Sequence, residues 1–416
     1  MKKIIIYGGS KLNGDVFVAG SKNASLALIA ASLLSKDKVI IQNVPKIQDV
    51  FELLEIIKTL NVKYDFVSSV LIVDSSKIEY RSLNIEAVKK LRASYYLMGI
   101  MLALFNKCEI CYPGGCDLGN RPIDMHLSSF KELGVSIRFE KGIYKLELLS
   151  PKNSTITFNK KSVGATINTL FLSSSFEQVK VKNISIEPEV MQVIEALTLM
   201  GVEISIEEEN CVIKGRKNKN GFMISVIPDR IEAGTYALIG AATSNELRIH
   251  NVKIDHLKSL LDVFDEINVK YSFIKNELVI YESKNIKGIE LSTNPYPGFP
   301  TDLQQPLTAL LTKASSDSVI EETVYKDRTA HIYELNNMGA NIKINNGKYY
   351  IQGNKKLKGK MIIGKDLRGT ASLILAALMS EGKSEILGLN YLERGYSNLI
   401  NNLKAIGAKI DVYEMD

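Results

Sequence analysis

Several features that define common protein classes are rare or absent in this 416-residue chain. Four cysteines are too few to form a disulfide framework in a chain of this length. The longest apolar run, 97–105, is about half as long as a membrane-spanning helix. The first residues also turn polar too early for a secretory signal, so the sequence predicts a cytoplasmic protein with no membrane segment.

The usual signatures of nucleotide, metal and redox sites are missing as well. Neither a P-loop nor a G-x-G-x-x-G motif occurs, and the four histidines are scattered along the chain. Cys108 and Cys111 form a C-x-x-C motif, but no second pair exists and the surrounding residues are typical of a β-strand. A zinc or redox pair is therefore disfavoured.

Arginine is scarce, since only 10 of the 52 basic residues are arginine. The net charge of +6 is too dilute to indicate a nucleic-acid or membrane partner. General drift toward lysine would explain the scarcity. Alternatively, the remaining arginines mark places where a planar guanidinium must hold a carboxylate or phosphate with two bonds.

What the chain does contain is ordinary globular composition, with 45% apolar and 24% charged residues, and a length that suggests two or three domains. A short pattern recurs six times within it: an amphipathic helix end, a Gly or Asn pivot, and an alternating run typical of a β-hairpin. Gly and Asn tolerate the left-handed conformation at a helix C-terminus. The pivots, 67 to 73 residues apart, are Asn61, Gly134, Gly201, Asn268, Gly339 and Gly407.

A second helix precedes each pivot and is apolar on nearly every side, which predicts that it is buried. The starts of these helices are polar, and a helix N-terminus attracts anions through its free N–H groups. Taken singly they would be ordinary caps, but six in phase predict an anion-binding surface if they converge. The starts are Lys22 with Asn23, Arg92, 160–164, Arg230 with Glu232, Asp302, and Arg368.

Two loops carry residues suited to acid–base chemistry. A Gly- and Pro-rich loop, 112–126, places Cys116 near Arg121, where a lowered thiol pKa would allow it to act as an acid or nucleophile. An unreactive surface cysteine is equally compatible with the pattern. A second segment, 295–306, contains Asp302 after three prolines and a glycine, and Asp302 is either an N-cap or a general base facing a cleft.

Taken together, these segments resemble the enolpyruvyl transferase family along the whole chain, in particular the members that act on UDP-N-acetylglucosamine at the first step of peptidoglycan synthesis. The most specific segment is PGGCDLGNRPIDMHL, which separates these enzymes from the relatives that act on shikimate 3-phosphate. Further matching segments are GSKNASL, KSVGATI, PGFPTDLQ, DLRGTASLILAAL and ERGYSNLI.

The resemblance implies a two-domain inside-out α/β barrel, built from six repeated subdomain units around buried parallel helices. One domain would be 22–229, with the cysteine loop. The other would combine 1–21 with 230–416. Each would hold three repeats, with the active site in the cleft between the domains.

The resemblance also implies roles for individual residues. In the family, phosphoenolpyruvate is held by residues that match Lys22, Arg121 and Arg394. Asp302 would take the proton from the sugar 3-hydroxyl, and Cys116 would be the loop acid and the target of fosfomycin. The positions that hold the UDP-sugar or line the same cleft match Asn23, Arg92, Arg121, Pro122, Ile123, Asp124, Met125, Lys160, Ser162, Val163, Asp302, Val324, Arg328 and Arg368.

The implied partners are phosphoenolpyruvate and UDP-N-acetylglucosamine, with no metal or redox cofactor and no nucleic acid or membrane. The oligomeric state is left open. Three positions depart from the family pattern, at Ile100, Gln192 and Pro306. A divergent paralogue therefore stays an alternative, either an enolpyruvyl transferase with another acceptor such as shikimate 3-phosphate or a non-catalytic UDP-sugar-binding protein.

Overall fold

Residues 2–114 and 123–414 are described by a computed structural model of the chain. Their contacts divide them into two compact units. The central unit comprises residues 20–114 and 123–227, and the terminal unit comprises 2–19 and 228–414. Cys116, Arg121 and Pro122 lie outside the described residues.

The central unit holds three sheets, with strand orders β13-β3-β5-β4, β6-β8-β7 and β11-β12-β10-β9. Its strands are β3 (Val39–Gln42), β4 (Lys63–Val67), β5 (Val70–Asp74), β6 (Lys107–Cys111), β7 (Val135–Glu140), β8 (Ile143–Leu148), β9 (Thr155–Thr157), β10 (Val179–Lys182), β11 (Glu203–Glu207), β12 (Asn210–Lys214) and β13 (Met223–Ser225). Its helices are α1 (Lys22–Ser32), α2 (Gln48–Lys58), α3 (Glu86–Lys90), the 3-10 turn η1 (Arg92–Tyr95), α4 (Tyr96–Phe105), α5 (Asp124–Glu132), α6 (Val163–Ser173) and α7 (Pro188–Leu199).

The terminal unit also holds three sheets, with orders β15-β16-β14-β2, β17-β18-β20-β19 and β21-β22-β1-β23. Its strands are β1 (Lys2–Tyr7), β2 (Leu12–Phe17), β14 (Ser244–His250), β15 (Tyr271–Ile274), β16 (Glu277–Tyr281), β17 (Glu290–Ser292), β18 (Ser318–Glu321), β19 (Ile342–Asn345), β20 (Lys348–Ile351), β21 (Met361–Ile363), β22 (Lys383–Leu387) and β23 (Lys409–Glu414). Its helices are α8 (Arg230–Thr243), the 3-10 turn η2 (Ile254–His256), α9 (Lys258–Glu266), α10 (Thr301–Leu311), α11 (Ala330–Asn337), α12 (Leu367–Met379), α13 (Leu389–Glu393) and α14 (Leu399–Ala405). The prediction of an α/β protein is confirmed.

The local predictions made from the repeat pattern are also confirmed. All six pivots have a positive φ, from 64° at Asn61 to 104° at Gly407. The five expected hairpins are present as β4–β5, β7–β8, β11–β12, β15–β16 and β19–β20. In five of these sheets, the hairpin strand that follows the pivot is an edge strand. In four of those five sheets, the strand at the opposite edge runs parallel to its neighbour.

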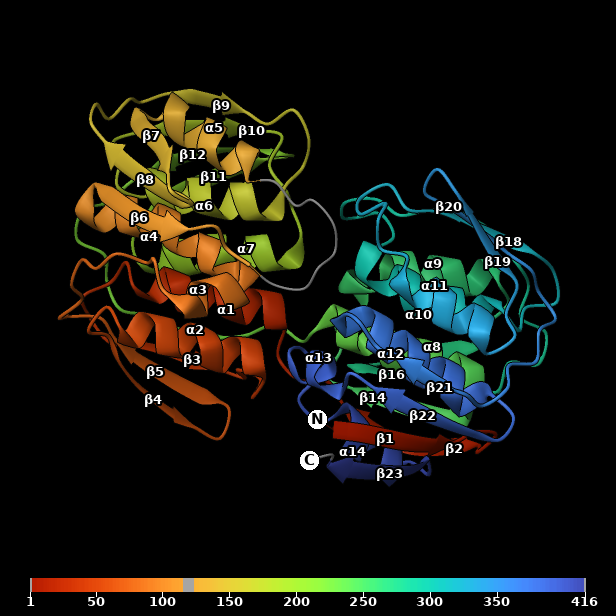
Figure 1. Cartoon of the computed structure of the whole chain (residues 1–416). Coiled ribbons are helices and arrows are strands. Elements are labelled where there is room, and N and C mark those ends of the chain that lie inside the picture. Colours follow the sequence, from red (N-terminus) through yellow and green to blue (C-terminus); the bar gives the residue numbers. More distant parts are fainter. Residues whose placement is uncertain (1, 115–122, 415–416) are drawn as a thin grey trace. The chain divides into compact units, whose positions relative to one another are not determined.

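The sixth repeat is completed by the opposite end of the chain. β23 follows the sixth pivot but pairs with β1, which also pairs with β22 on its other side. Figure 1 shows β1, in red, between β22 and β23, in blue. β1 therefore takes the place that the second hairpin strand takes in the other sheets.

The second helix of each repeat is buried on nearly every side, as its apolar sequence predicts. In the terminal unit, α8, α10 and α12 pack against one another, and in the central unit α4 packs against α1 and α6. One predicted helix start differs: Arg92 lies in η1, and the α-helix begins at Tyr96. The Ser94 hydroxyl donates to the carbonyl of Leu91 at 2.6 Å within this turn, and 3-10 turns are frequent at the N-termini of α-helices.

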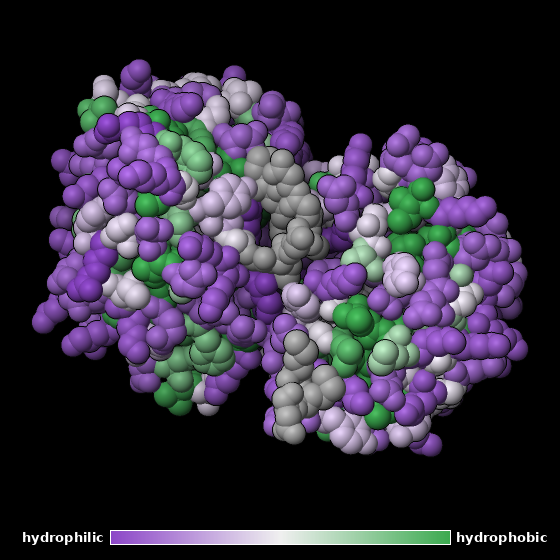
Figure 2. Space-filling view, in the orientation of Figure 1, coloured by the Kyte–Doolittle hydropathy of each residue, from purple (hydrophilic) through white to green (hydrophobic). Residues whose placement is uncertain are grey.

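Each unit has its own hydrophobic core. One cluster of buried side chains runs from Ala24 to Val226 in the central unit, and the other contains only residues of the terminal unit. The face shown in Figure 2 is mostly hydrophilic, with apolar residues in small patches. Among the described residues, no helix is both long and apolar enough to cross a membrane.

Candidate active site

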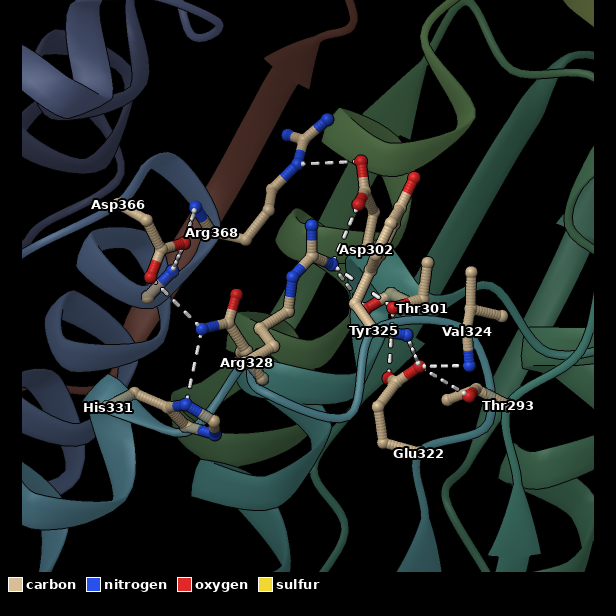
Figure 3. Close-up of polar contacts among 12 residues, drawn as sticks. Thr293, Thr301, Asp302, Glu322, Val324, Tyr325, Arg328, His331, Asp366 and Arg368 are labelled. Carbon is tan, nitrogen blue, oxygen red and sulfur yellow. Dashed lines mark hydrogen bonds and ion pairs between the residues drawn. The ribbon is translucent and has the colours of Figure 1, made fainter. Parts of the chain in front are cut away.

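Asp302 lies in the first turn of α10, directly after the Pro-rich loop that leads into this helix. One of its carboxylate oxygens accepts a hydrogen bond from Nη1 of Arg328 at 2.8 Å, and the other lies 3.3 Å from Nε of Arg368. Figure 3 shows both guanidinium groups directed at this carboxylate. Three residues that are distant in the sequence therefore form one ionic cluster.

Arg328 comes from the loop between β18 and α11, and its side chain is only 4% exposed. Its Nη1 also donates to the backbone carbonyl of Thr301 at 2.9 Å, and its guanidinium lies over the ring of Tyr325. Nε of Arg328 is buried without a hydrogen-bond partner in the described part of the chain. An unsatisfied N–H on a buried cation is suited to an anionic or carbonyl oxygen.

Arg368 lies in the first turn of α12, where Asp366 caps the helix by accepting from the N–H groups of Arg368 and Gly369. Burial on its own would lower the pKa of Arg368, but Tyr396, Asp302 and Asp229 reverse this effect and raise it. The guanidinium lies over the ring of Tyr396. Its Nη1 is a second buried N–H without a partner among the described residues.

Glu322 was not singled out in the sequence. It directly follows β18 and is fully buried. One carboxylate oxygen accepts from the Thr293 hydroxyl and from the backbone N–H groups of Val324 and Tyr325, and the other accepts from the Thr301 hydroxyl. These four contacts are drawn in Figure 3. An acidic residue at a strand end, two positions before Val324, is the sequence signal that could have identified it.

A second group of buried polar side chains lies beneath the arginines. The amide nitrogen of Gln305 is 3.2 Å from Nδ1 of His331 and 3.3 Å from a carboxylate oxygen of Asp366. Burial lowers the pKa of His331 to about 3, and the charge of Arg328 acts in the same direction. His331 is therefore neutral at physiological pH, and its Nδ1 accepts the hydrogen bond from Gln305.

The start of α8 contains another buried carboxyl group. Asp229 caps this helix through the N–H groups of Ile231 and Glu232. Glu232 accepts a hydrogen bond from the backbone N–H of Ala19 at 2.9 Å. Burial, together with the neighbouring Asp229, raises the pKa of Glu232 to about 8, against the opposing influence of Ala19 and Arg368.

In the central unit, Lys22 and Asn23 are the first two residues of α1, which is capped by Ser21. Nζ of Lys22 lies 2.7 Å from the carboxylate of the buried Asp49, at the start of α2. The ammonium is thereby held at the polar end of a buried helix, where a helix N-terminus and a cation together attract an anion.

Arg92 lies over the rings of Tyr95 and Tyr112, and its Nη1 donates to the carbonyl of Pro113 at 3.4 Å. Burial lowers the pKa of the neighbouring His126 to about 3, and the charge of Arg92 contributes to this shift. The amide of Asn168 contacts Nδ1 of this neutral histidine at 2.9 Å. The guanidinium of Arg92 therefore packs on two aromatic rings, which restrict its orientation.

Most of the other predicted site residues lie at or near helix ends, whereas Val324 lies in the loop between β18 and α11. Ser162 caps α6 by accepting from the N–H of Ala165, and Val163 begins that helix. Arg394 directly follows α13. Lys160 precedes α6, whereas Ile123, Asp124 and Met125 form the start of α5. Val324 is 38% exposed, although its N–H is fixed by Glu322.

The three positions that depart from the expected family pattern all lie in helices, namely α4, α7 and α10. Ile100 is fully buried in α4. The side-chain amide of Gln192 donates a hydrogen bond to the carbonyl of Ser225 and accepts one from the backbone N–H of Ile227. These two bonds fix the last residues of the central unit. Pro306 lies inside α10.

The cysteines of the C-x-x-C motif are buried in β6, and burial raises the pKa of both thiols. A raised pKa disfavours the thiolate that redox chemistry and metal binding need. Among the described residues, no cluster of His, Cys, Asp or Glu is arranged to hold a metal ion.

Comparison with known sequences identifies full-length relatives. The family model for EPSP synthase (3-phosphoshikimate 1-carboxyvinyltransferase) matches residues 6–403. UDP-N-acetylglucosamine 1-carboxyvinyltransferase 2 of Listeria monocytogenes is 42% identical over 412 residues, which cover 98% of this chain and 97% of that protein. The protein of the same name from Bacillus subtilis is 41% identical over 413 residues, covering 99% and 96%.

Solved structures share the fold at lower identity. The enolpyruvyl transferase NikO from Streptomyces tendae has a TM-score of 0.91 at 23% identity and covers 99% of this chain and 98% of its own. EPSP synthase from Acinetobacter baumannii has a TM-score of 0.78 at 17% identity, with both chains fully covered.

Proposed function

We propose that this chain, which belongs to the EPSP synthase family, transfers the enolpyruvyl group of phosphoenolpyruvate to the 3-hydroxyl of UDP-N-acetylglucosamine and releases phosphate. This reaction is the first committed step of peptidoglycan synthesis. The observation that carries the proposal is the carboxylate of Asp302 held between two buried guanidinium groups, in a chain with full-length relatives named for this activity.

The reaction is an addition followed by an elimination. Protonation of the methylene carbon of phosphoenolpyruvate leaves a cationic centre at C2, which the sugar hydroxyl attacks while a base removes its proton. The tetrahedral intermediate then loses a proton and phosphate. We assign the initial proton donor to Cys116, which lies outside the described residues, and the base to Asp302.

The environment of Asp302 supports this assignment. One carboxylate oxygen lies 2.8 Å from Nη1 of Arg328 and the other lies 3.3 Å from Nε of Arg368, so the contact with Arg368 is the weaker of the two. A hydroxyl that approaches the second oxygen would replace the weaker contact while Arg328 holds the other. The base would then be oriented by one cation, and the neighbouring guanidinium would be available to the substrate.

The charge of the substrates matches the proposed binding residues. Phosphoenolpyruvate would contact Lys22, Arg121 and Arg394. The UDP-sugar would contact a second set, namely Asn23, Arg92, Arg121, Pro122, Ile123, Asp124, Met125, Lys160, Ser162, Val163, Asp302, Val324, Arg328 and Arg368. Both substrates are polyanions, so fixed cations stabilise their binding and the departing phosphate. The proposal requires side chains from both units.

We also propose that each unit is an inside-out barrel of three repeats, with its sheets outside and the buried helices inside. The mutual packing of α8, α10 and α12 supports this arrangement for the terminal unit. The packing of α4 on α1 and α6 supports it for the central unit.

The proposal is tested by measuring phosphate release from phosphoenolpyruvate in the presence of UDP-N-acetylglucosamine. We expect release that requires both substrates. No release would contradict the proposed activity. A parallel reaction with shikimate 3-phosphate tests the other acceptor, and binding of UDP-N-acetylglucosamine without release would indicate a non-catalytic binding protein.

A further inference from the structure

Glu322 connects three separate segments of the terminal unit. The first is the residue after β17, Thr293, whose hydroxyl donates to the carboxylate at 2.9 Å. The second is the loop at Val324 and Tyr325, whose backbone N–H groups both donate at 2.8 Å. The third is the start of α10, where the Thr301 hydroxyl donates at 2.9 Å.

These contacts satisfy a carboxylate that is fully buried. An ionised carboxylate accepts hydrogen bonds only, and burial makes each missing donor costly. Bonds to a charged acceptor are also stronger than those between neutral groups. Glu322 is therefore a fixed point to which the three segments are tied.

The contact with Thr301 leads directly to the proposed base. Thr301 precedes Asp302, and both its carbonyl and its hydroxyl accept from Nη1 of Arg328, at 2.9 and 3.2 Å. The same nitrogen donates to Asp302 at 2.8 Å. Figure 3 shows this line of contacts from Glu322 through Thr301 to Arg328 and Asp302. A displacement of Thr301 would therefore move both the carboxylate and the cation that orients it.

The contact with the loop leads to the proposed sugar site. Val324 has a partly exposed side chain, but its backbone is fixed by the carboxylate of Glu322. Glu322 thus holds two elements on the acceptor side of the reaction. Its four hydrogen bonds go to Thr293, Thr301, Val324 and Tyr325, none of which is assigned to phosphoenolpyruvate.

We propose that Glu322 is a positioning residue for the acceptor substrate. Through Thr301 it fixes the position of Asp302, and through Val324 it fixes the position of the backbone proposed to bind the sugar. This inference rests on the proposed function. Glu322 does not touch the substrate, and its effect reaches the reacting atoms through Thr301 and Arg328.

Two matched variants separate positioning from general stabilisation. Thr301→Val and Thr293→Val each remove one hydroxyl donor to the same carboxylate. Only Thr301 leads to the base. We expect Thr301→Val to lower kcat by roughly 10- to 100-fold, because a small misplacement of a reacting group has effects of this size. Thr293→Val should lower the melting temperature and leave kcat unchanged.

Glu322→Gln tests the carboxylate itself. One amide oxygen can still accept from the loop N–H groups, but the amide NH2 cannot accept from Thr301. We expect Glu322→Gln to lower kcat by no more than Thr301→Val, which also removes the hydroxyl that accepts from Nη1 of Arg328. The double variant should show no greater loss than Thr301→Val alone, because the contact between Glu322 and Thr301 is already broken in it. KM for phosphoenolpyruvate should stay constant in every variant. KM for the UDP-sugar should rise in Glu322→Gln, because a neutral amide oxygen holds the loop N–H groups less tightly than a carboxylate.

The outcomes distinguish this inference from the proposed function. A wild-type protein that releases no phosphate would overturn the proposed function and the inference with it. An active wild type whose Thr301→Val and Thr293→Val variants lose kcat equally would overturn the inference alone. The same conclusion follows if Glu322→Gln lowers the melting temperature without changing kcat. Because the threonine pair does not require Glu322→Gln to fold, the test remains decisive if that variant is unstable.

Discussion

At the scale of single residues, Asp302 is the group on which the proposed chemistry depends most directly. Asp302→Asn keeps the size of the side chain but cannot take a proton from a hydroxyl. We expect kcat to fall by roughly 10²- to 10⁴-fold, the usual contribution of a general base, while both substrates still bind. Phosphate release gives the turnover, and calorimetric titration gives the affinities.

The exposed Asp327 provides a matched control, because Asp327→Asn makes the same chemical change beside the same arginine without touching Asp302. This control should retain wild-type turnover. Near-normal turnover of Asp302→Asn would contradict the assignment of Asp302 as the base.

Glu232 makes stability depend on pH. Burial raises its pKa to about 8 in the folded chain, against an ordinary value of 4.5. The folded state therefore binds this proton more tightly than the unfolded state. The contribution is fully present below about pH 4.5 and is lost as the pH rises through about 8. Glu232→Gln should weaken this loss, because the amide stays neutral and still accepts from Ala19.

Urea unfolding at pH 5, 7 and 9 measures this effect. The fall in the free energy of unfolding toward pH 9 should be smaller in Glu232→Gln than in the wild type. Glu266→Gln, at an exposed position on α9, should follow the wild-type curve. Identical slopes for the wild type and Glu232→Gln would show that Glu232 is ionised throughout.

At the scale of elements, α10 contains a proline where an α-helix normally has an N–H. Pro306 lies inside the helix, so the carbonyl of Asp302, four residues earlier, cannot receive the usual helical hydrogen bond. Pro306→Ala restores the donor. The penalty for an interior proline is about 3 kcal/mol, and the lost ring leaves a small cavity that offsets part of it. We expect a net gain of about 1 kcal/mol or more in the free energy of unfolding.

Chemical denaturation of Pro306→Ala measures the gain. Pro300→Ala is the control, because Pro300 is the N-cap and its position needs no helical N–H. A lower stability for Pro306→Ala would mean that packing of the proline ring outweighs the missing hydrogen bond.

The elements show which features the sequence predicted and which it could not. Local rules were sufficient for the pivots, where Gly and Asn supply the positive φ at Asn61 and Gly134, and for the all-round burial of α8. They failed at Arg92, which lies in a 3-10 turn, because the apolar pattern alone does not distinguish such a turn from the first turn of an α-helix.

The candidate site divides in the same way. Asp302, Arg328 and Arg368 were singled out because their segments carry charge at the starts of buried helices or in the motif loops. Glu322 was missed because its importance comes from donors on Thr293 and Thr301, which are remote in sequence. Contacts of this kind are set by tertiary packing and leave no periodic signal.

At the scale of the whole molecule, the two units differ in how their chain segments are assembled. The core of the central unit contains only residues between Ala24 and Val226. We therefore expect a fragment of residues 20–227 to fold alone and to unfold cooperatively, because its core lies within one continuous stretch. Circular dichroism and calorimetry of the fragment measure this behaviour.

A fragment of residues 228–416 is the matched comparison. It lacks β1 and β2, so two of its three sheets are incomplete, and β23 has no partner within the fragment. We expect it to be unfolded or aggregated. A stable 228–416 fragment, or an unfolded 20–227 fragment, would contradict this account of the two units.

The position of β1 between β22 and β23 also has a consequence for biosynthesis on the ribosome. Ile4 and Ile6 are fully buried in the finished sheet, yet residues 383–414 must be translated before their partners exist. At roughly 5 to 20 residues per second, the strand waits on the order of tens of seconds. The central unit emerges and can fold during this interval. The nascent chain therefore carries an exposed apolar segment ahead of a folded unit, which is the situation in which a holding chaperone is most useful.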